Sequence, residues 1–208
     1  MYVYLIRHAQ SEDNLLNLST RLTVSEYNSL LRHAPEALLT REGERQAQAM
    51  GGKLRPLRIE RLYSSPYPRA LATAKVMGQE LELAVQVCDD LREVQPMLLK
   101  ESQWAATLGQ HFFRSYVRML WPWGRHETWI KEYQRAQRIW AWIETEAVQN
   151  MALVSHGWFL RLLLLAGPRY HHWHILQRDF SNGGLSVLTN RIPVLHEPTF
   201  WSNKWPHA

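Results

Sequence analysis

Hydrophobic residues in this chain fall into short continuous runs separated by segments with helical spacing. The run 2–6 is aromatic and β-branched and apolar at every position, which predicts a central strand covered on both faces. Further strands are predicted over 59–64, 151–155 and 182–188. Strands that alternate with helices predict the α/β class, as a three-layer α/β/α sandwich with a mostly parallel central sheet.

Helices are predicted in three of the connections. Thr40 is the expected N-cap of the first helix, because acidic residues occupy its first turn and apolar residues then follow at helical spacing. The second helix opens around Pro68, since proline is well tolerated in the first turn. The third begins at about Gly157, directly after the strand over 151–155.

The segment 96–150 has a different pattern. A series of its apolar residues is spaced alternately by four and three positions, which predicts a long amphipathic helix. The series is Trp129, Tyr133, Ala136, Trp140, Ile143 and Ala147. We therefore expect one domain over 1–208, with a helical insertion at about 96–150 that packs over one end of the sheet. The Trp-rich tail, 201–205, is expected either to pack back on the body or to be mobile.

Composition narrows the class of protein. A hydrophobic fraction of 46% with 21% charged residues is typical of a folded globular chain. The net charge of +5 favours an anionic partner without choosing between a phosphorylated metabolite, nucleic acid and a membrane surface. Cys88 is the single cysteine, which excludes an intramolecular disulfide and a cysteine-rich metal site.

Targeting and membrane signals are not evident in the pattern. The first strand begins at Tyr2, which leaves no room for a signal peptide. The longest apolar run, 158–167, is interrupted by Arg161 and is too short to span a bilayer. No recognised nucleic-acid-binding motif supports the basic charge. We therefore expect a cytoplasmic protein with no membrane or nucleic-acid partner, of undetermined oligomeric state.

Basic side chains follow three of the predicted strands at their carboxyl ends. Arg7 and His8 come after the first strand, Arg69 after the second, and His156 after the third. In open α/β sheets, ligands bind where these strand ends converge. Such a concentration of positive charge is unfavourable unless an anion relieves it, and the planar guanidinium group suits phosphate oxygens. The pattern predicts a phosphate site at this edge.

The segments that carry these residues resemble a known family. Arg7-His8-Ala9-Gln10-Ser11-Glu12-Asp13-Asn14 is similar to the Arg-His-Gly signature of the histidine phosphatase, or phosphoglycerate mutase-like, superfamily, with Ala9 at the usual glycine. Four further segments match in order: Leu39-Thr40-x-x-Gly43, Ser65-Pro66-x-x-Arg69-Ala70-x-x-Thr73-Ala74, Leu91-Arg92-Glu93 and Val154-Ser155-His156-Gly157. Asn182 resembles a sixth. The matches cover roughly residues 1–93 and 151–189, and leave the helical insertion outside them.

The resemblance implies a role for each matching residue. His8 is the expected nucleophile, which attacks phosphorus through one ring nitrogen while a hydrogen bond holds the other. Arg7, Arg69 and His156 are expected to hold the phosphoryl oxygens and to stabilise the charge on them during transfer. The chemistry needs neither a metal nor another cofactor.

Two further residues have expected roles. Glu93 resembles the general acid that protonates the leaving alkoxide and then, ionised, accepts a proton from water. Asn14 is expected to add a donor to the phosphate. After Glu93 the chain departs from the family, because 94–98 lacks the usual Gly-x-x-Glu-Gly-like segment.

The leading hypothesis is a metal-independent phosphomonoesterase that acts on a small phosphorylated metabolite. A phosphoglycerate mutase ranks lower, because the chain lacks the Glu-x-x-Tyr-Gly-x-x-Gln-Gly-like segment of those enzymes. A phosphohistidine protein phosphatase also ranks lower, because the small bacterial members lack such an insertion. A non-catalytic protein of the same fold that binds a phospho-ligand or a protein is the alternative from another class.

Other motifs have ordinary interpretations. His171-His172-x-His174 is interpreted as a surface loop rather than a metal site. Trp121-Pro122-Trp123 offers a surface that stacks nucleobases or grips a partner, although packing is the favoured role for most tryptophans. Ser11, Ser65 and Ser155 are interpreted as turn and cap residues, since no Gly-x-Ser-x-Gly motif surrounds them.

Overall fold

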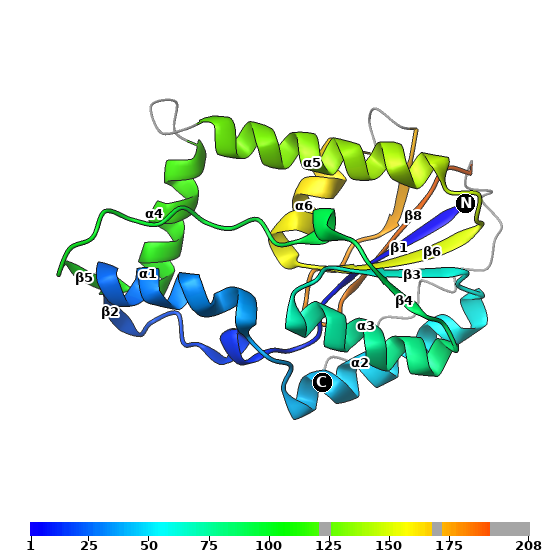
Figure 1. Cartoon of the computed structure of the whole chain (residues 1–208), viewed down its shortest axis with the longest axis horizontal. Helices are drawn as coiled ribbons and strands as arrows, with labels where there is room; N and C mark the ends of the chain where they lie inside the picture. The colour runs from blue at the N-terminus through cyan, green and yellow to red at the C-terminus, as the bar shows by residue number, and fades with distance from the viewer. Residues whose placement is uncertain (121–125, 168–171, 192–208) are drawn as a thin grey trace.

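The computed structural model of the chain describes residues 1–120, 126–167 and 172–191. At its centre is a six-stranded sheet of order β4-β3-β6-β1-β8-β7 (Figure 1). Its strands are β1 (Tyr2–Arg7), β3 (Arg61–Ser64), β4 (Val85–Val87), β6 (Asn150–Ser155), β7 (His174–Gln177) and β8 (Leu185–Thr189). The first four are mutually parallel, and β8 runs antiparallel to both of its neighbours. The predicted mostly parallel sheet is confirmed.

Helices cover both faces of the sheet and form the outer layers. They are α2 (Arg41–Leu54), α3 (Pro68–Leu81), α5 (His126–Thr145) and α6 (Gly157–Ala166). Val3 and Leu5 of β1 are buried in the core beneath α5 and α6, whereas Tyr4 and Ile6 are buried in the core beneath α2 and α3. Successive side chains of a strand point to opposite faces, so an apolar run without polar breaks requires a cover on each side. The three-layer prediction is therefore confirmed (Figure 1).

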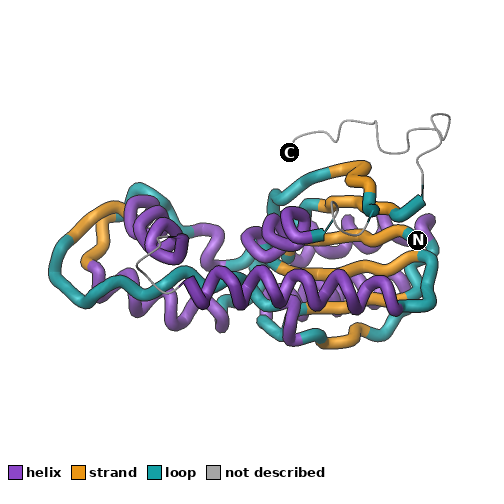
Figure 2. Tube along the Cα trace, turned by 90° about the horizontal axis from the view of Figure 1, so that it is seen from above, coloured by secondary structure: helices purple, strands orange, loops and turns teal. Residues whose placement is uncertain are grey.

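A smaller group of elements, here called the side lobe, projects from one end of the sandwich (Figures 1 and 2). It consists of β2 (Arg21–Thr23), α1 (Val24–His33), β5 (Ala105–Thr107) and α4 (Leu108–Leu120). β2 and β5 pair antiparallel, which joins two segments far apart in the sequence. Short 3-10 turns complete the chain at η1 (Glu12–Leu15), η2 (Ala34–Glu36), η3 (Arg55–Leu57) and η4 (Asp89–Leu91).

The segment 96–150 contributes to both parts of the molecule. Its first half supplies β5 and α4 to the side lobe, while α5 packs on α6 within the sandwich. The predicted apolar stripe is confirmed at Ala136, Trp140 and Ile143, which are fully buried in the core. Ala147 is exposed, because α5 ends at Thr145 and Val148 fills the core instead.

Several predicted boundaries change near the end of the chain. The strand predicted over 182–188 begins only at Leu185, because the preceding turn uses Gly183 with a φ of 68°. The surface-loop interpretation is wrong at His174, which opens the edge strand β7. His171, the Trp121-Pro122-Trp123 motif and the tail 201–205 lie outside the described residues. Within the described ranges, no helix is long and apolar enough to cross a membrane.

The start of α2 docks directly on the segment that follows β1. Thr40 caps the helix by accepting a hydrogen bond from Gly43 N at 3.0 Å, and its own N–H donates to Gln10 O at 3.0 Å. A Cβ atom at Gly43 would collide with the same Gln10 oxygen and with the Leu39 side chain. The glycine therefore sets how closely α2 approaches the segment after β1.

Two glycines of α2 provide a matched test of this close packing. Gly43→Ala should lower the free energy of unfolding by about 1–3 kcal/mol, because backbone must move to admit the methyl group. Gly52→Ala should raise it by up to about 1 kcal/mol, because nothing lies within 4 Å of its Cβ position and alanine favours the helix. Urea unfolding of both variants checks the prediction, which fails if the two shifts have the same sign.

Candidate active site

Three adjacent strands bring the predicted site residues together at their carboxyl ends. His8 follows β1, Ser65 follows β3, and His156 follows β6, which lies between the other two. Backbone hydrogen bonds extend the sheet to these positions, since His8 N donates to Ser155 O at 2.8 Å and Ser65 N donates to Val154 O at 3.0 Å. As a result the His8 and His156 ring centroids lie 5.1 Å apart.

Hydrogen bonds hold the buried His8 ring in one tautomer. Nδ1 lies 2.8 Å from Ala9 O, and a carbonyl oxygen only accepts, so Nδ1 carries the proton. Nε2 then presents its lone pair and accepts a hydrogen bond from Arg69 Nε at 3.2 Å. Burial first, and the neighbouring Arg69 charge second, lower the pKa of His8 from 6.5 to about 3. The ring is therefore neutral and its Nε2 is a potential nucleophile.

Two guanidinium groups flank the His8 ring, and neither forms an ion pair with a carboxylate in the described part of the chain. Arg69 donates from Nη1 to Ala34 O at 2.6 Å, and Arg7 donates from Nη1 to Phe180 O at 2.9 Å. Arg7 Nε is buried and has no hydrogen-bond partner among the described residues. Burial is also the main cause that lowers the pKa of Arg7. An anion between these groups would offset the cost of burying them.

Thr73 ties the segment after β1 to helix α3. Its hydroxyl accepts a hydrogen bond from Ala9 N at 3.1 Å and donates to Arg69 O at 2.7 Å. Ala9 is fully buried and is not among the residues with positive φ, so alanine fits where the resembling motif has glycine. One threonine thus fixes the nucleophile's backbone relative to Arg69.

His156 lies behind this pair, completely buried. Its Nε2 is 2.8 Å from Ser65 Oγ, and its ring meets the Tyr67 ring edge-on with centroids 5.1 Å apart. Nδ1 is buried without a hydrogen-bond partner in the described part of the chain. Burial, followed by the proximity of His8, holds the pKa of His156 well below its usual value. His156 is not among the residues that line the cavity described below.

Asn14 reaches the site from η1 and is fixed by its side-chain oxygen. Oδ1 accepts hydrogen bonds from Ser11 N at 3.2 Å and from Asn182 Nδ2 at 2.5 Å. With the oxygen occupied, the remaining function of this amide is to donate from Nδ2. Asn182, which precedes the last strand, thus takes a supporting position beside the site.

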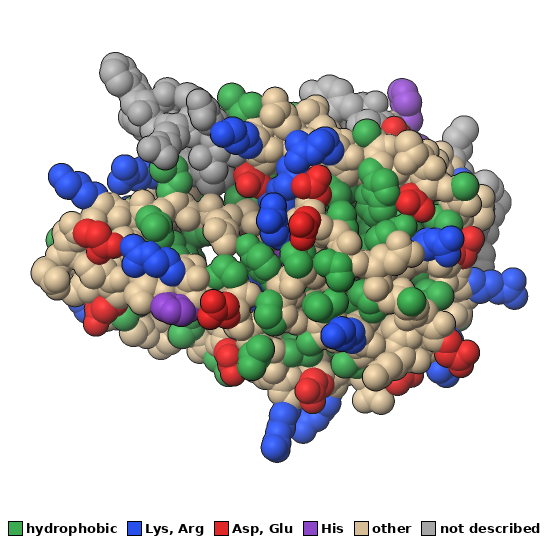
Figure 3. Space-filling model, viewed as in Figure 1, with side chains coloured by type: hydrophobic (Ala, Val, Ile, Leu, Met, Phe, Trp, Pro, Cys, Tyr) green, Lys and Arg blue, Asp and Glu red, His purple; other side chains and the backbone are tan. Residues whose placement is uncertain are grey.

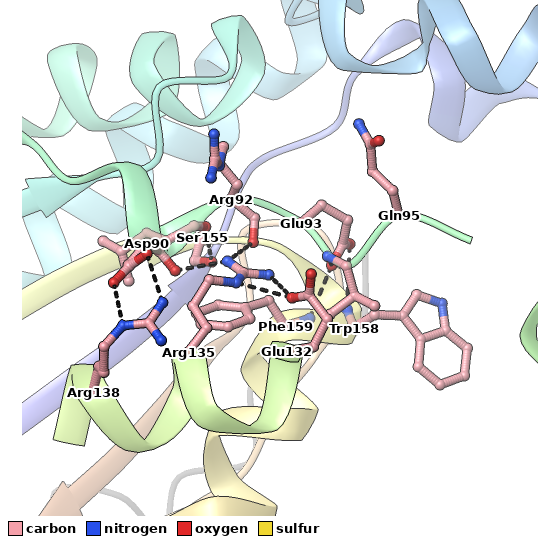
Figure 4. Close-up of polar contacts among 12 residues, drawn as sticks. Asp90, Arg92, Glu93, Gln95, Glu132, Arg135, Arg138, Ser155, Trp158 and Phe159 are labelled. Atoms are coloured by element: carbon pink, nitrogen blue, oxygen red, sulfur yellow. Dashed lines mark hydrogen bonds and ion pairs between the residues drawn. The ribbon is translucent and has the colours of Figure 1, made fainter. Parts of the chain in front are cut away.

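Glu93 lines the same cavity as His8, and its carboxylate lies at the start of α6 (Figure 4). Its Oε1 accepts hydrogen bonds from Val94 N and Phe159 N, both at 2.9 Å, and Oε2 accepts one from Trp158 N at 3.3 Å. The carboxylate thereby caps α6, whose N-cap residue His156 makes no side-chain capping bond. Burial raises the pKa of Glu93 more than these three donors lower it.

Arg135 anchors the loop that carries Glu93, and the sequence analysis does not identify it. This buried residue of α5 donates from Nη1 to Asp90 O and to Arg92 O, both at 2.7 Å (Figure 4). Its guanidinium lies 3.9 Å from the centre of the Phe159 ring and pairs with Glu132. In sequence, a Glu and an Arg three residues apart on a helix indicate a surface pair, so nothing there reveals the contact with the loop.

A cavity of about 760 Å³ opens onto the site. Its charged end contains four of the predicted residues together with His8: Arg7, Asn14, Arg69 and Glu93. The cavity extends between the sandwich and the side lobe, and Figure 3 shows hydrophobic side chains around the hollow between these two parts. A phosphate group at the charged end would meet a neutral imidazole, two guanidinium groups and a carboxyl group.

Comparison with known proteins assigns the chain to a family. The model of the histidine phosphatase superfamily (branch 1) matches residues 3–191. The chain belongs to this superfamily. A 2,3-bisphosphoglycerate-dependent phosphoglycerate mutase of Bartonella henselae is similar to it, at 26% identity over 204 residues that cover 89% of this chain and 90% of the mutase.

Solved structures share the histidine phosphatase fold. A mutant phosphoserine phosphatase of Entamoeba histolytica in complex with phosphoserine has a TM-score of 0.58 and 18% identity, covering 89% of each chain. The phosphoserine phosphatase of the same organism with 3-phosphoglyceric acid has a TM-score of 0.57 and 19% identity over the same shares. Phosphatases and a mutase are thus both among the similar proteins, and the resemblance stated from the ordered motifs is confirmed.

The buried neutral His8 should make stability depend on pH. Between pH 6.5 and about 3 the unfolded chain protonates this histidine and the folded chain does not, so stability falls as the pH falls. His8 contributes a loss of about 1.4 kcal/mol for each pH unit in this window. Urea unfolding at pH 6 and pH 5 should show a smaller loss in His8→Asn than in the wild type. The exposed His33→Asn is the control, and equal losses in wild type and His8→Asn would contradict the assignment.

Proposed function

We propose that this protein is a metal-independent phosphomonoesterase that forms a phosphohistidine on Nε2 of His8. The observation that supports this most directly is the hydrogen bond from His8 Nδ1 to Ala9 O, which leaves the Nε2 lone pair facing Arg69. A neutral imidazole held in one tautomer next to two guanidinium groups combines a nucleophile with donors for a phosphoryl group.

In the first step the phosphate dianion of the substrate binds between Arg7 and Arg69. Arg69 Nε turns from His8 Nε2 to a phosphoryl oxygen, which frees the lone pair. The bond between Nε2 and phosphorus then forms as the bond from phosphorus to the ester oxygen breaks. Glu93 gives its proton to that oxygen, and the substrate leaves as an alcohol.

In the second step water replaces the alcohol. The Glu93 carboxylate accepts a proton from the water, whose oxygen bonds to phosphorus while the bond from phosphorus to Nε2 breaks. Inorganic phosphate leaves, and His8 is again neutral with its proton on Nδ1. Asn14 Nδ2 is proposed to donate to the phosphoryl oxygens, a role supported by its place in the cavity lining and by the hydrogen bonds that occupy its Oδ1. His156 Nδ1, which has no hydrogen-bond partner among the described residues, is proposed as a second donor from behind the cavity lining.

A phosphoglycerate mutase is the second candidate, supported by the relative from Bartonella henselae. It shares the first step but returns the phosphoryl group from His8 to a bound phosphoglycerate. The two activities differ in product, since the phosphatase releases inorganic phosphate and the mutase releases an isomeric ester.

The proposed nucleophile is tested with p-nitrophenyl phosphate, with and without a chelator. Wild type should release phosphate at the same rate in both conditions, and His8→Ala should lose the activity by at least the roughly 10²-fold typical of a lost catalytic group. His33→Ala is a matched control that should keep the activity, because it removes an exposed imidazole that does not line the cavity. Normal turnover in His8→Ala would exclude the mechanism. Phosphate binding without turnover in the wild type would indicate a binding protein instead.

The role of Glu93 is tested by the leaving group. p-Nitrophenolate departs without a proton, whereas an alkoxide needs one. Glu93→Gln should therefore lower kcat/KM for an alkyl phosphate by about 10²–10⁴-fold and for p-nitrophenyl phosphate far less. In the wild type, kcat/KM for the alkyl phosphate should decline with increasing pH as Glu93, whose pKa is raised, loses its proton. Glu93→Gln should remove this decline. If kcat/KM fell equally on both substrates, Glu93 would only cap α6 and would donate no proton to the leaving group.

A further inference from the structure

We propose that the alcohol part of the substrate is apolar and uncharged, so that the enzyme acts on monophosphate esters of hydrophobic alcohols. This inference rests on the proposed phosphatase activity. It concerns the part of the cavity beyond the charged end, where the side lobe faces the sandwich.

The walls of that part are built from large apolar side chains of the side lobe and its connections. They include Leu16, Leu18, Leu30, Leu98, Phe112 and Phe113. Several of these chains remain in contact with solvent, with exposed fractions of 60% for Leu18 and 70% for Phe113. Exposed apolar groups gathered along one cavity mark a binding surface, because covering them removes hydrophobic area from water.

An aromatic face joins these walls to the catalytic end. Tyr116 of α4 and Trp158 of α6 contact each other with ring centroids 4.4 Å apart, and Trp158 is 49% exposed. Both residues line the cavity, as does Tyr67 beside Arg69. Trp158 N donates to Glu93, so this face begins beside the group proposed to protonate the leaving oxygen. The carbon attached to that oxygen would therefore enter an aromatic environment.

The unpaired positive charge in the cavity lining is confined to the catalytic end and suits a single phosphate group. Of the described arginines in its lining, Arg7 and Arg69 belong to the catalytic end, and Arg32 is paired with Glu101 at 3.2 Å. Asp13, another lining residue, accepts a hydrogen bond from Ser11 Oγ. A carboxylate or second phosphate on the substrate would therefore lose its water without gaining an unpaired cation. An uncharged apolar group has no such cost.

A series of n-alkyl phosphates tests the inference, because the leaving groups have similar acidity and differ mainly in length. From methyl to hexyl phosphate, kcat/KM should rise roughly two- to fourfold for each methylene, as expected for its burial. O-phosphoserine and 3-phosphoglycerate should be poorer substrates than propyl phosphate, which is of similar size and has no additional charge. A flat or falling series, or a preference for the charged esters, would overturn the inference.

Variants locate the effect in the cavity. Phe113→Gln and Leu16→Gln should each flatten the dependence on chain length, since both residues line the cavity. Both side chains are exposed, so these substitutions leave the buried core intact. Leu165→Gln is the matched control, because Leu165 is 61% exposed on α6 and is not among the lining residues, so its series should equal the wild type's. An unchanged series in both cavity variants would overturn the assignment of this surface. If the two cavity variants changed the oligomeric state and left the alkyl series unchanged, the apolar surface would be assigned to contact with a second copy of the chain.

The two proposals fail in different ways. If p-nitrophenyl phosphate is not hydrolysed through His8, the phosphatase activity is wrong. If it is hydrolysed while the alkyl series is flat, the activity stands and the apolar substrate class is wrong.

Discussion

Burial of two imidazoles and the Arg69 guanidinium at one edge of the sheet, with Arg7 partly buried beside them, is the constraint on which the rest of the site depends. Charged groups removed from water need compensation, and among the described residues no carboxylate forms an ion pair with either arginine of this cluster. The chain compensates them with fixed carbonyl oxygens, those of Ala34 and Phe180. The same burial keeps both histidines neutral. The same physical cost underlies both parts of the proposed chemistry, the anion site and the nucleophile.

The geometry of the sheet brings these groups together. Parallel pairing of β1, β3 and β6 places the strand ends side by side, and backbone hydrogen bonds continue past the last residue of each strand. Gly43 and Thr73 then fix the segment after β1 from two helices on the same face. The sandwich supplies the charged end of the cavity, while helices α1 and α4 of the side lobe supply part of its apolar lining.

The sequence predicted the sandwich and the positions of His8, Arg69 and His156, because these follow from local patterns. Continuous apolar runs specify buried strands, and residues at the ends of parallel strands meet whatever the details of packing. It did not predict the side lobe, since the pairing of Arg21 with Thr107 joins distant segments that have no strong strand pattern. The role of Glu93 as a cap of α6 and the anchoring by Arg135 also depend on contacts between elements far apart in the chain.

The hydrogen bond from Arg69 Nε to His8 Nε2 has a chemical consequence for the unliganded protein. While it is present, the lone pair is masked, and an electrophile that approaches the ring finds it already engaged. A ligand with enough negative charge to attract the guanidinium would expose the nitrogen. Carboxylic esters and other neutral electrophiles lack that charge. Under the proposed mechanism, this hydrogen bond would protect the nucleophile from adventitious acylation and would favour phosphoryl donors before any bond is made.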